Sequence, residues 1–377
     1  MGTPINYYVD PAAGSDLMGS GTKMMPWASI QYALDTGITR DATHGDQINL
    51  KAGADDVLNS TLDFSTYGSS DWGSPLIIRG YTTDENDGGV GGISGDDSYQ
   101  IAGAGQFHHY FDLHMHSTGS NTILSMGTYS TVYGCEFDNT TGGGIDSGSV
   151  NGSRVIACYF HNIGGSGVQM RGEYGSEIKA NYFKNGSNEF SDAVFCTGAA
   201  MEVSYNIISI GGASNGINFT TWGNTIYSNS VLSSGGTGYG IDIPPDGVSQ
   251  AVGNCIEGFS GTGGKGFKGT GGGDITLWGL NACYNNETDY SSLPDVHLEL
   301  GDNESLGSSP FAKSGSDTFA NRATYFAAAD TGNVRGGGYP SGYNLDKGAV
   351  QSAGGGGGTT TNVFIPAASG RFGVRES

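Results

Sequence analysis

The sequence predicts an all-β protein that folds as a right-handed parallel β-helix of about ten coils, with an N-terminal capping helix and a glycine-linked C-terminal tail. Three observations predict this class. A short phrase returns at a nearly fixed period, 68 of the 377 residues are glycine, and only 14% are charged. A repeat unit of roughly 20–30 residues is too small to bury its own apolar face, so it must stack on its neighbours.

The repeated phrase occurs seven times between residues 131 and 285. Its fourth position is Cys or Asn, and apolar residues usually lie three positions before and two positions after it. These anchor residues are Cys135, Cys158, Asn181, Asn206, Asn229, Asn254 and Asn281. Because successive coils stack about 4.8 Å apart, equivalent residues lie above one another. We expect the Asn anchors to form a buried hydrogen-bonded ladder and the Cys anchors to stay reduced.

Residues 1–45 are predicted to form an N-terminal cap. Residues 5–10 alternate as in a strand, and residues 26–35 have the apolar spacing of a helix, with Pro26 at the start and Gly37 after the end. A helix here covers the unpaired edge of the first coil.

Residues 46–290 are predicted to form the coils of the β-helix, and residues 291–353 form irregular closing coils. A Gly/Thr linker at 354–361 then leads to a tail at 362–377. We expect the tail to dock on another subunit as an added strand, the alternative being a frayed terminus. The apolar docking residues are Val363, Phe364, Ile365 and Phe372.

The composition argues against several classes of partner. The net charge is −21 with only 16 Lys and Arg residues, which disfavours nucleic acid and anionic membranes. No run approaches 18 apolar residues, and the first residues lack the basic and apolar regions of a signal peptide. The five cysteines lack CxxC spacing, so neither a disulfide framework nor a zinc site is indicated.

Several strings resemble the right-handed β-helix proteins of the pectate-lyase-like superfamily. YYVDPAAGSD, PWASIQYALD, GDQINLKAG and LIIRGY resemble their opening, and SPFAKSGSDTFANRATYF and LDKGAVQ resemble their closing segment. This resemblance implies the fold over residues 5–351. It implies no single function, because the superfamily includes lyases, hydrolases, virion tailspikes and carbohydrate-binding proteins without activity. No catalytic residue is carried over from it.

Candidate catalytic residues lie on the outward face of the first regular coils. Glu136 and Asp138 are two residues apart on one predicted strand, with Cα atoms roughly 7 Å apart, and His161 lies one coil further on. Two carboxylates beside an imidazole are the groups that a glycosidase uses as acid and as base or nucleophile. The alternative is an ordinary solvated sheet face. The residues expected to bind a glycan are Tyr159, Tyr182, Gln169 and Arg171.

The stretch HHYFDLHMH at 108–116 alternates as one strand. In that reading one face carries the polar set, and the other carries mainly apolar residues. The polar set is His108, Tyr110, Asp112, His114 and His116. Histidines two apart on a strand can converge on a metal, which makes His114 and His116 candidate ligands. A polar outer face remains the favoured interpretation, and we expect no resident cofactor.

An acidic, glycine-rich stretch at 81–99 offers oxygen ligands for Ca²⁺, including Asp84 and Asp87. It lacks the spacing of an EF-hand, so a solvated loop is the favoured interpretation.

Two functions are compatible with these observations. The favoured one is a structural bacteriophage virion protein: a fibre, spike or decoration protein. We expect it to assemble as a homo-oligomer in the host cytoplasm, to dock other virion subunits through its tail, and to bind cell-surface polysaccharide. The alternative is a secreted polysaccharide lyase or glycoside hydrolase. A lyase needs a Lys or Arg base near metal-binding acids, and Arg171, Lys179 and Lys184 align with none. The acidic charge also disfavours polyanionic substrates.

Overall fold

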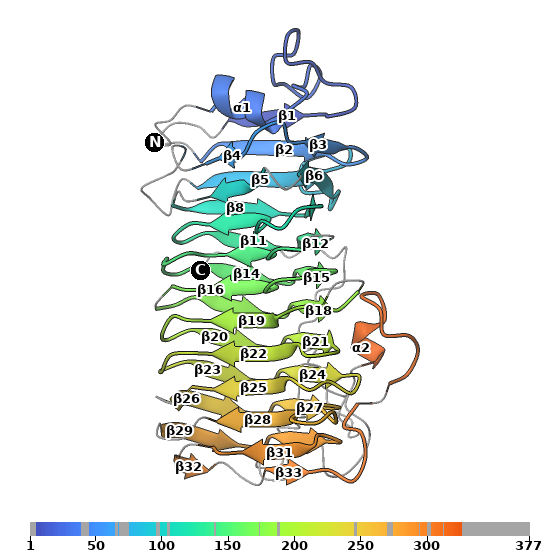
Figure 1. Cartoon of the computed structure of the whole chain (residues 1–377). Coiled ribbons are helices and arrows are strands. Elements are labelled where there is room, and N and C mark those ends of the chain that lie inside the picture. The colour runs from blue at the N-terminus through green and yellow to red at the C-terminus, as the bar shows by residue number, and fades with distance from the viewer. Residues whose placement is uncertain are drawn as a thin grey trace, which may run out of the picture.

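The chain forms a right-handed parallel β-helix, a column of stacked coils with one strand on each of three sides (Figure 1). This is a computed structural model, and it describes residues 5–38, 45–64, 67, 75–95, 99–103, 106–138, 141–172, 174–186, 189–244, 247–269, 274–293, 295–299, 303–311 and 313–325. Within these residues the sheets contain 12, 11 and 10 strands, in agreement with the predicted number of coils.

All three sheets are parallel, and each strand pairs with its counterparts in the coils before and after it. The 12-stranded sheet consists, in spatial order, of β1 (Asn6–Val9), β2 (Gln47–Lys51), β5 (Leu76–Tyr81), β8 (His108–Phe111), β11 (Thr131–Tyr133), β14 (Arg154–Ile156), β17 (Glu177–Lys179), β20 (Glu202–Ser204), β23 (Thr225–Tyr227), β26 (Gly247–Val252), β29 (Asp274–Gly279) and β32 (Asp295–Glu299). The 11-stranded sheet consists of β3 (Asp55–Val57), β6 (Gly91–Gly95), β9 (Leu113–Ser117), β12 (Glu136–Asp138), β15 (Tyr159–His161), β18 (Tyr182–Lys184), β21 (Ile207–Ile210), β24 (Ser230–Ser233), β27 (Cys255–Glu257), β30 (Ala282–Tyr284) and β33 (Glu304–Ser305). The 10-stranded sheet consists of β4 (Leu62–Asp63), β7 (Ile101–Gly103), β10 (Leu124–Met126), β13 (Ile145–Asp146), β16 (Val168–Met170), β19 (Asp192–Cys196), β22 (Asn215–Phe219), β25 (Tyr239–Ile243), β28 (Lys265–Gly269) and β31 (Thr288–Ser291).

The core is a set of continuous stacks of apolar side chains, some of them identical in neighbouring coils. Phe137, Phe160 and Phe183 are the central residues of successive strands, and all three are fully buried. Their ring centroids are 4.9 and 4.8 Å apart, which is the spacing of the coils themselves. Each buried Phe contributes about 1.5–3 kcal/mol, and each fixes its two strand neighbours on the outer face.

The predicted Asn ladder is confirmed. Nδ2 of Asn206 donates to the Ile178 carbonyl (2.9 Å) and to Oδ1 of Asn229 (3.0 Å). Its Oδ1 accepts from the backbone N–H of Asn181 (3.0 Å). The pattern repeats along the column and continues one coil beyond the predicted copies, to Asn303.

At the other end of the ladder, Cys135 and Cys158 take the anchor position. Both are free, buried thiols, as predicted. The residue before each anchor has a left-handed backbone conformation, as at Gly134 (φ 65°) and Ala157 (φ 57°). This residue makes the bend between the 12-stranded and the 11-stranded sheets, so the residue after the anchor faces outward.

The interpretation of residues 108–116 as one strand is wrong. Asp112 has φ 53° and makes the same bend, which separates β8 from β9. The bend changes which side chains point inward: His108 and Tyr110 are buried in the core, whereas His114 and His116 lie on the outer face of β9. This copy of the repeat escapes recognition because Leu113 occupies the anchor position instead of Cys or Asn.

The predicted N-terminal helix is confirmed but begins later. Helix α1 covers Ile30–Thr36, and the hydroxyl of Ser29 caps it by accepting from the backbone N–H of Tyr32 (3.2 Å). The helix buries Ile30, Ala33 and Leu34 at the N-terminal end of the column, beside β1 (Figure 1). No helix among the described residues is long and apolar enough to cross a membrane.

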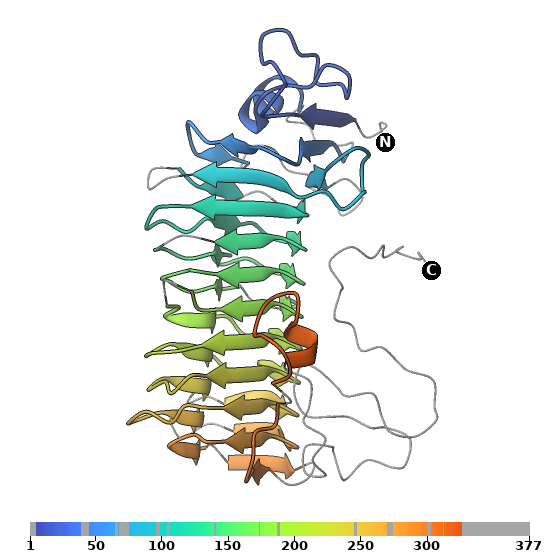
Figure 2. The same cartoon turned by 90° about the vertical axis from the view of Figure 1, so that its right-hand side faces the viewer.

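After β33 the chain turns back along the column. Residues 309–311 and 313–325, which we call the strap, lie on the outer face of the 11-stranded sheet and end in the short helix α2 (Arg322–Tyr325) (Figure 2). The sequence does not predict this return. The predicted linker and docking tail, with Val363, Phe364, Ile365 and Phe372, lie outside the described residues.

Candidate active site

Five titratable side chains gather on the outer face of three neighbouring strands of the 11-stranded sheet. In the strand register, His114 of β9 lies beside Glu136 of β12, and His116 lies beside Asp138. His161 comes from the next strand, β15, which pairs with β12. We call these five residues the His–carboxylate cluster. The structure thus brings the predicted catalytic residues together and adds two histidines from the preceding coil.

Asp138 is the centre of the cluster. Its Oδ1 accepts from Nδ1 of His116 (2.7 Å) and lies 3.3 Å from Nε2 of His114, and its Oδ2 lies 3.7 Å from Nε2 of His161. Burial raises the pKa of Asp138, but the contacts with the imidazoles of His114 and His116 outweigh this effect, and the net pKa is lowered. Asp138 is therefore a carboxylate at neutral pH.

The His114 imidazole interacts with the same carboxylate. Its interaction with Asp138 raises the pKa of His114, against the opposing effect of burial. Nε2 of His114 is a buried nitrogen that lies 3.3 Å from Oδ1 of Asp138 without the alignment of a regular hydrogen bond. Such an atom can also coordinate a metal.

Glu136 and His161 form the second half of the cluster. Nδ2 of Asn162 donates to Nδ1 of His161 (3.1 Å), so the neutral imidazole carries its proton on Nε2. Nε2 in turn donates to Oε1 of Glu136 (2.8 Å). The Glu136 side chain is 40% exposed, compared with 18% for Asp138, and is therefore the carboxylate that reaches solvent.

The cluster also fits a divalent transition metal. A ring nitrogen of His114 and one oxygen each of Glu136 and Asp138 lie within 4.8 Å of one another. A mixed nitrogen and oxygen donor set suits Zn²⁺ or Mn²⁺ better than Ca²⁺, which prefers oxygen ligands alone. His114 and His116 are the histidines that the sequence marks as candidate ligands, and the structure places both in this cluster.

The other two candidate metal ligands, Asp84 and Asp87, have partners within the chain. Asp84 pairs with Lys23 (2.6 Å). Both carboxylate oxygens of Asp87 accept backbone N–H groups of its own loop, and these hydrogen bonds hold its pKa far below the usual range. The pattern indicates that Asp87 organises the loop.

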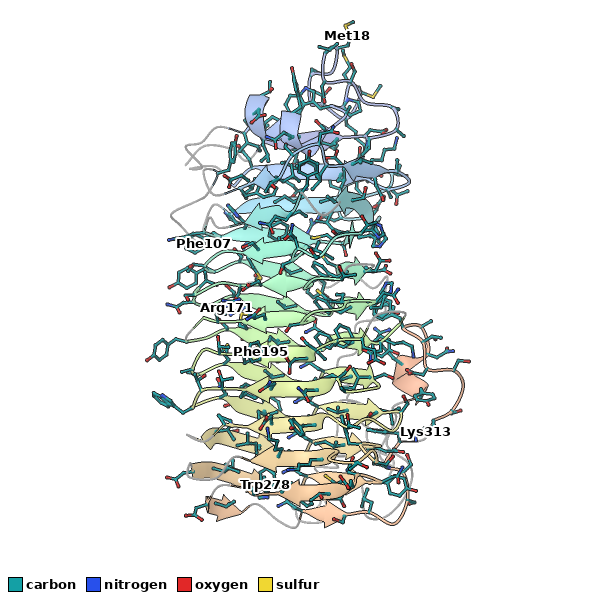
Figure 3. The ribbon with its side chains drawn as sticks, viewed as in Figure 1. Met18, Phe107, Arg171, Phe195, Trp278 and Lys313 are labelled. Carbon is teal, nitrogen blue, oxygen red and sulfur yellow. The ribbon has the colours of Figure 1, made fainter. Side chains whose placement is uncertain are left out.

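The four residues expected to bind a glycan lie on two different faces. Tyr159 and Tyr182 stack on each other on the 11-stranded sheet, with ring centroids 5.3 Å apart. Gln169 lies in β16 of the 10-stranded sheet, and Arg171 follows it and pairs with Asp146 (2.9 Å). Figure 3 shows Arg171 on the front face, away from the strap residue Lys313 at the right-hand edge. Only the tyrosine pair adjoins the cluster: the ring of Tyr159 stacks on His161 at 4.4 Å.

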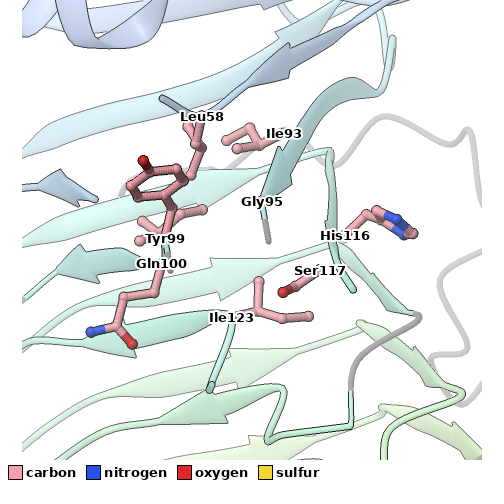
Figure 4. Close-up of a pocket in the computed structure, with 9 residues that line it drawn as sticks. Leu58, Ile93, Gly95, Tyr99, Gln100, His116, Ser117 and Ile123 are labelled. Carbon is pink, nitrogen blue, oxygen red and sulfur yellow. The ribbon is translucent and has the colours of Figure 1, made fainter. Parts of the chain in front are cut away.

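The cluster lies on an open face and not in a closed cavity. Figure 4 shows a small void near it, with Leu58 and Ile93 on its wall and the His116 imidazole directed away from them. Its volume of about 10 Å³ holds one water molecule at most. A ligand of the cluster would therefore approach from the outer surface.

Sequence reasoning missed two parts of this region. The 22-residue spacing from His114 to Glu136, and from His116 to Asp138, matches the repeat and is a signal that places both histidines beside the carboxylates. The strap residues have no such signal, because they follow no period.

Comparisons with known proteins support the fold. No family model and no curated protein sequence matches the chain. Among solved structures, the pectate lyase Pel9A is 16% identical, with 93% of this chain and 97% of that chain covered and a TM-score of 0.50. A rhamnogalacturonan lyase is 13% identical, with 74% of each chain covered and a TM-score of 0.39. A mannuronic acid specific polysaccharide family 6 lyase from human gut microbiota is 15% identical, with 80% and 86% covered and a TM-score of 0.41. The likeness to the pectate lyase shows the pectate-lyase-like β-helix fold.

Proposed function

We propose that this protein cleaves glycosidic bonds of a polysaccharide that lies along the outer face of the 11-stranded sheet. The observation that carries the proposal is the pair formed by Glu136 and Asp138. Their carboxylate oxygens lie within 4.8 Å, and each carboxylate accepts a hydrogen bond from a different imidazole. Glycoside hydrolysis uses two carboxylates in different roles, and here their environments differ.

The environments assign the roles. Asp138, with a lowered pKa, is the permanent carboxylate and acts as nucleophile on the anomeric carbon. Glu136 is more exposed and acts as the acid: its carboxyl group protonates the leaving oxygen, and the resulting carboxylate then takes a proton from the water that hydrolyses the glycosyl ester on Asp138. Nε2 of His161 holds Glu136 in position by donating to its Oε1. One oxygen of Glu136 lies within 4.8 Å of one oxygen of Asp138, which leaves less room than the roughly 6.5–9.5 Å that an inverting enzyme needs for its water, so we expect retention of the anomeric configuration.

Hydrolysis is favoured over the elimination reaction of a lyase. A lyase uses a strong base, commonly Lys or Arg, to remove a proton beside a uronate. The side chains of Asn162 and Tyr159 contact the cluster at His161, and neither is a strong base. Lys184, which lies one coil beyond His161, is paired with Asp317 of the strap (2.5 Å).

The cluster also favours an enzyme over a purely structural role. Five titratable groups in mutual contact cost desolvation free energy, and a face that only maintains the column needs none of them. The proposals of a virion location, a homo-oligomer and a docking tail are compatible with glycan cleavage, as is secretion. Removal of residues 362–377 tests the docking proposal: loss of assembly supports it, and unchanged assembly overturns it.

The test is a screen of neutral and acidic polysaccharides for new reducing ends. We expect cleavage by the natural protein without unsaturated sugar ends, and a loss of at least about 100-fold in Glu136→Gln and Asp138→Asn. The matched control is Glu177→Gln, an outward carboxylate on the 12-stranded sheet, which keeps the full rate. Full activity in both cluster variants, with their folding intact by circular dichroism, contradicts the proposal.

A further inference from the structure

The strap places a carboxylate in a cradle on the outer face of the 11-stranded sheet. Oδ1 of Asp317 accepts from the hydroxyl of Tyr182 (2.6 Å). Its Oδ2 accepts from Nζ of Lys184 (2.5 Å) and from the hydroxyl of Ser209 (2.6 Å). The donors come from the neighbouring strands β18 and β21. Both oxygens of one carboxylate are thus bound by one cation and two hydroxyl groups.

Two residues further on, the strap places a ring on the tyrosine pair. Phe319 stacks on Tyr159 with a centroid distance of 4.7 Å and an interplanar angle of 18°, and it contacts Tyr182 at 6.0 Å. Tyr159 also stacks on His161 of the cluster. The strap therefore covers the surface directly beside the proposed reaction centre, and Tyr182 is only 1% exposed beneath it.

We propose that Asp317 and Phe319 occupy a binding subsite for an acidic sugar, and that the strap is an internal mimic that such a ligand displaces. A uronic acid residue carries in one unit the two groups that the strap presents: a carboxylate and a ring with an apolar face. The carboxylate fits the cradle of Tyr182, Lys184 and Ser209, and the ring face fits the aromatic platform. This inference rests on the proposed function, because it names the substrate class of the same face.

The attachment of the strap suits displacement. The backbone hydrogen bonds found for residues 313–325 join strap residues to one another, as between the Lys313 N–H and the Tyr325 carbonyl (2.8 Å). The strap therefore holds the sheet through side chains: Asp317 and Phe319 near the cluster, and Lys313 on Glu257 further down. Phe311 and Tyr325 also pack in an apolar cluster with residues of the sheet. Its release breaks no hydrogen bond of the Asn ladder and leaves the coils intact.

The net charge of −21 does not oppose this ligand at short range. At physiological ionic strength, charges more than about 8 Å apart are largely screened, so the contact with Lys184 outweighs the distant acidic groups. When a ligand replaces Asp317, the local charge balance at the cradle is unchanged.

The test measures binding of a defined galacturonic acid oligomer by calorimetry, with a neutral galactose oligomer of the same length. We expect the double variant Asp317→Ala/Phe319→Ala to bind the acidic oligomer at least ten-fold more tightly than the natural protein. Adding Lys184→Ala abolishes the gain. Ser314→Ala, at an exposed strap position, is the matched control and binds like the natural protein. In the natural protein, the acidic oligomer speeds trypsin cleavage of the strap at Lys313 or Arg322.

Two results overturn the inference: no gain of affinity in the double variant, or an equal gain for the neutral oligomer. Its failure is distinguishable from failure of the proposed function. Tight binding of the acidic oligomer without cleavage of any glycan supports the proposed subsite and contradicts the proposed enzymatic function. Cleavage of a neutral glycan without binding of the acidic oligomer supports the proposed enzymatic function and contradicts the proposed subsite.

Discussion

The ladder residue nearest to the cluster offers a quantitative test of how the fold positions the site. Oδ1 of Asn181 accepts from the buried N–H of Cys158 (2.9 Å), and its Nδ2 donates to the carbonyl of Val155 (2.9 Å). Asn181→Ala removes both partners. An unpaired buried polar group costs about 1–3 kcal/mol, so the two groups together cost about 2–6 kcal/mol of unfolding free energy. Because His161 lies three residues after Cys158, the same change disturbs the strand that carries it.

The assays are thermal unfolding and hydrogen exchange. In a chain of 377 residues a loss of this size lowers Tm by roughly 3–8 °C, and the amide of Cys158 loses its protection because its acceptor is gone. The control is Asn218→Ala, which removes a single half-buried contact with Asp192 (3.0 Å) and changes Tm little. A Tm within about 1 °C of the natural protein, with the Cys158 amide still protected, refutes the stabilising role of the ladder.

Three further predictions concern charged groups. The pKa of His114 is raised in the folded protein, so this residue stabilises the fold fully at pH values below 6.5, its pKa in the unfolded chain. This stabilisation is lost as pH rises through the folded pKa, which lowers Tm, and the pH-dependent fall in Tm should be absent in His114→Gln. Burial raises the pKa of Asp56, which accepts from the Ile30 N–H (2.7 Å), to about 6. The natural protein should therefore lose about 2–3 kcal/mol as pH rises from 4 to 7, and denaturant titrations of Asp56→Asn should show no such loss. Zn²⁺ should bind at the cluster and inhibit cleavage, because the metal would occupy the carboxylate oxygens of Glu136 and Asp138 that the reaction uses. Calorimetry should show at least ten-fold weaker Zn²⁺ binding in His114→Ala. Unchanged affinity in this variant would contradict the proposed metal ligands.

The column is predictable because stacking imposes one residue type on one position of every coil. Asn206 needs Asn229 above it and Asn181 below it, and this requirement appears in the sequence as a period. The same period predicts that Glu136 lies beside Tyr159, and the pairing of β12 with β15 confirms it. Local periodicity therefore predicts both the fold and two of the three strands that carry the site, β12 and β15.

The remaining features depend on contacts that leave no periodic signal. The bend at Asp112 escapes prediction because Leu113 fills the anchor position by apolar packing in place of hydrogen bonding. Helix α1 begins at Ile30 because Ser29 caps it and Asp56, 26 residues further on, accepts the Ile30 N–H. The strap contacts join Asp317 to Tyr182, 135 residues apart, so no local pattern predicts them.

The most direct test of glycan cleavage at the His–carboxylate cluster is the configuration of the first sugar end released, followed by proton NMR during the initial turnovers. The separation of Glu136 and Asp138 predicts that the natural protein retains the anomeric configuration, and that Asp138→Asn releases no product. Inversion of the configuration, or release of product by Asp138→Asn at the natural rate, contradicts the assignment of this pair as the reaction centre.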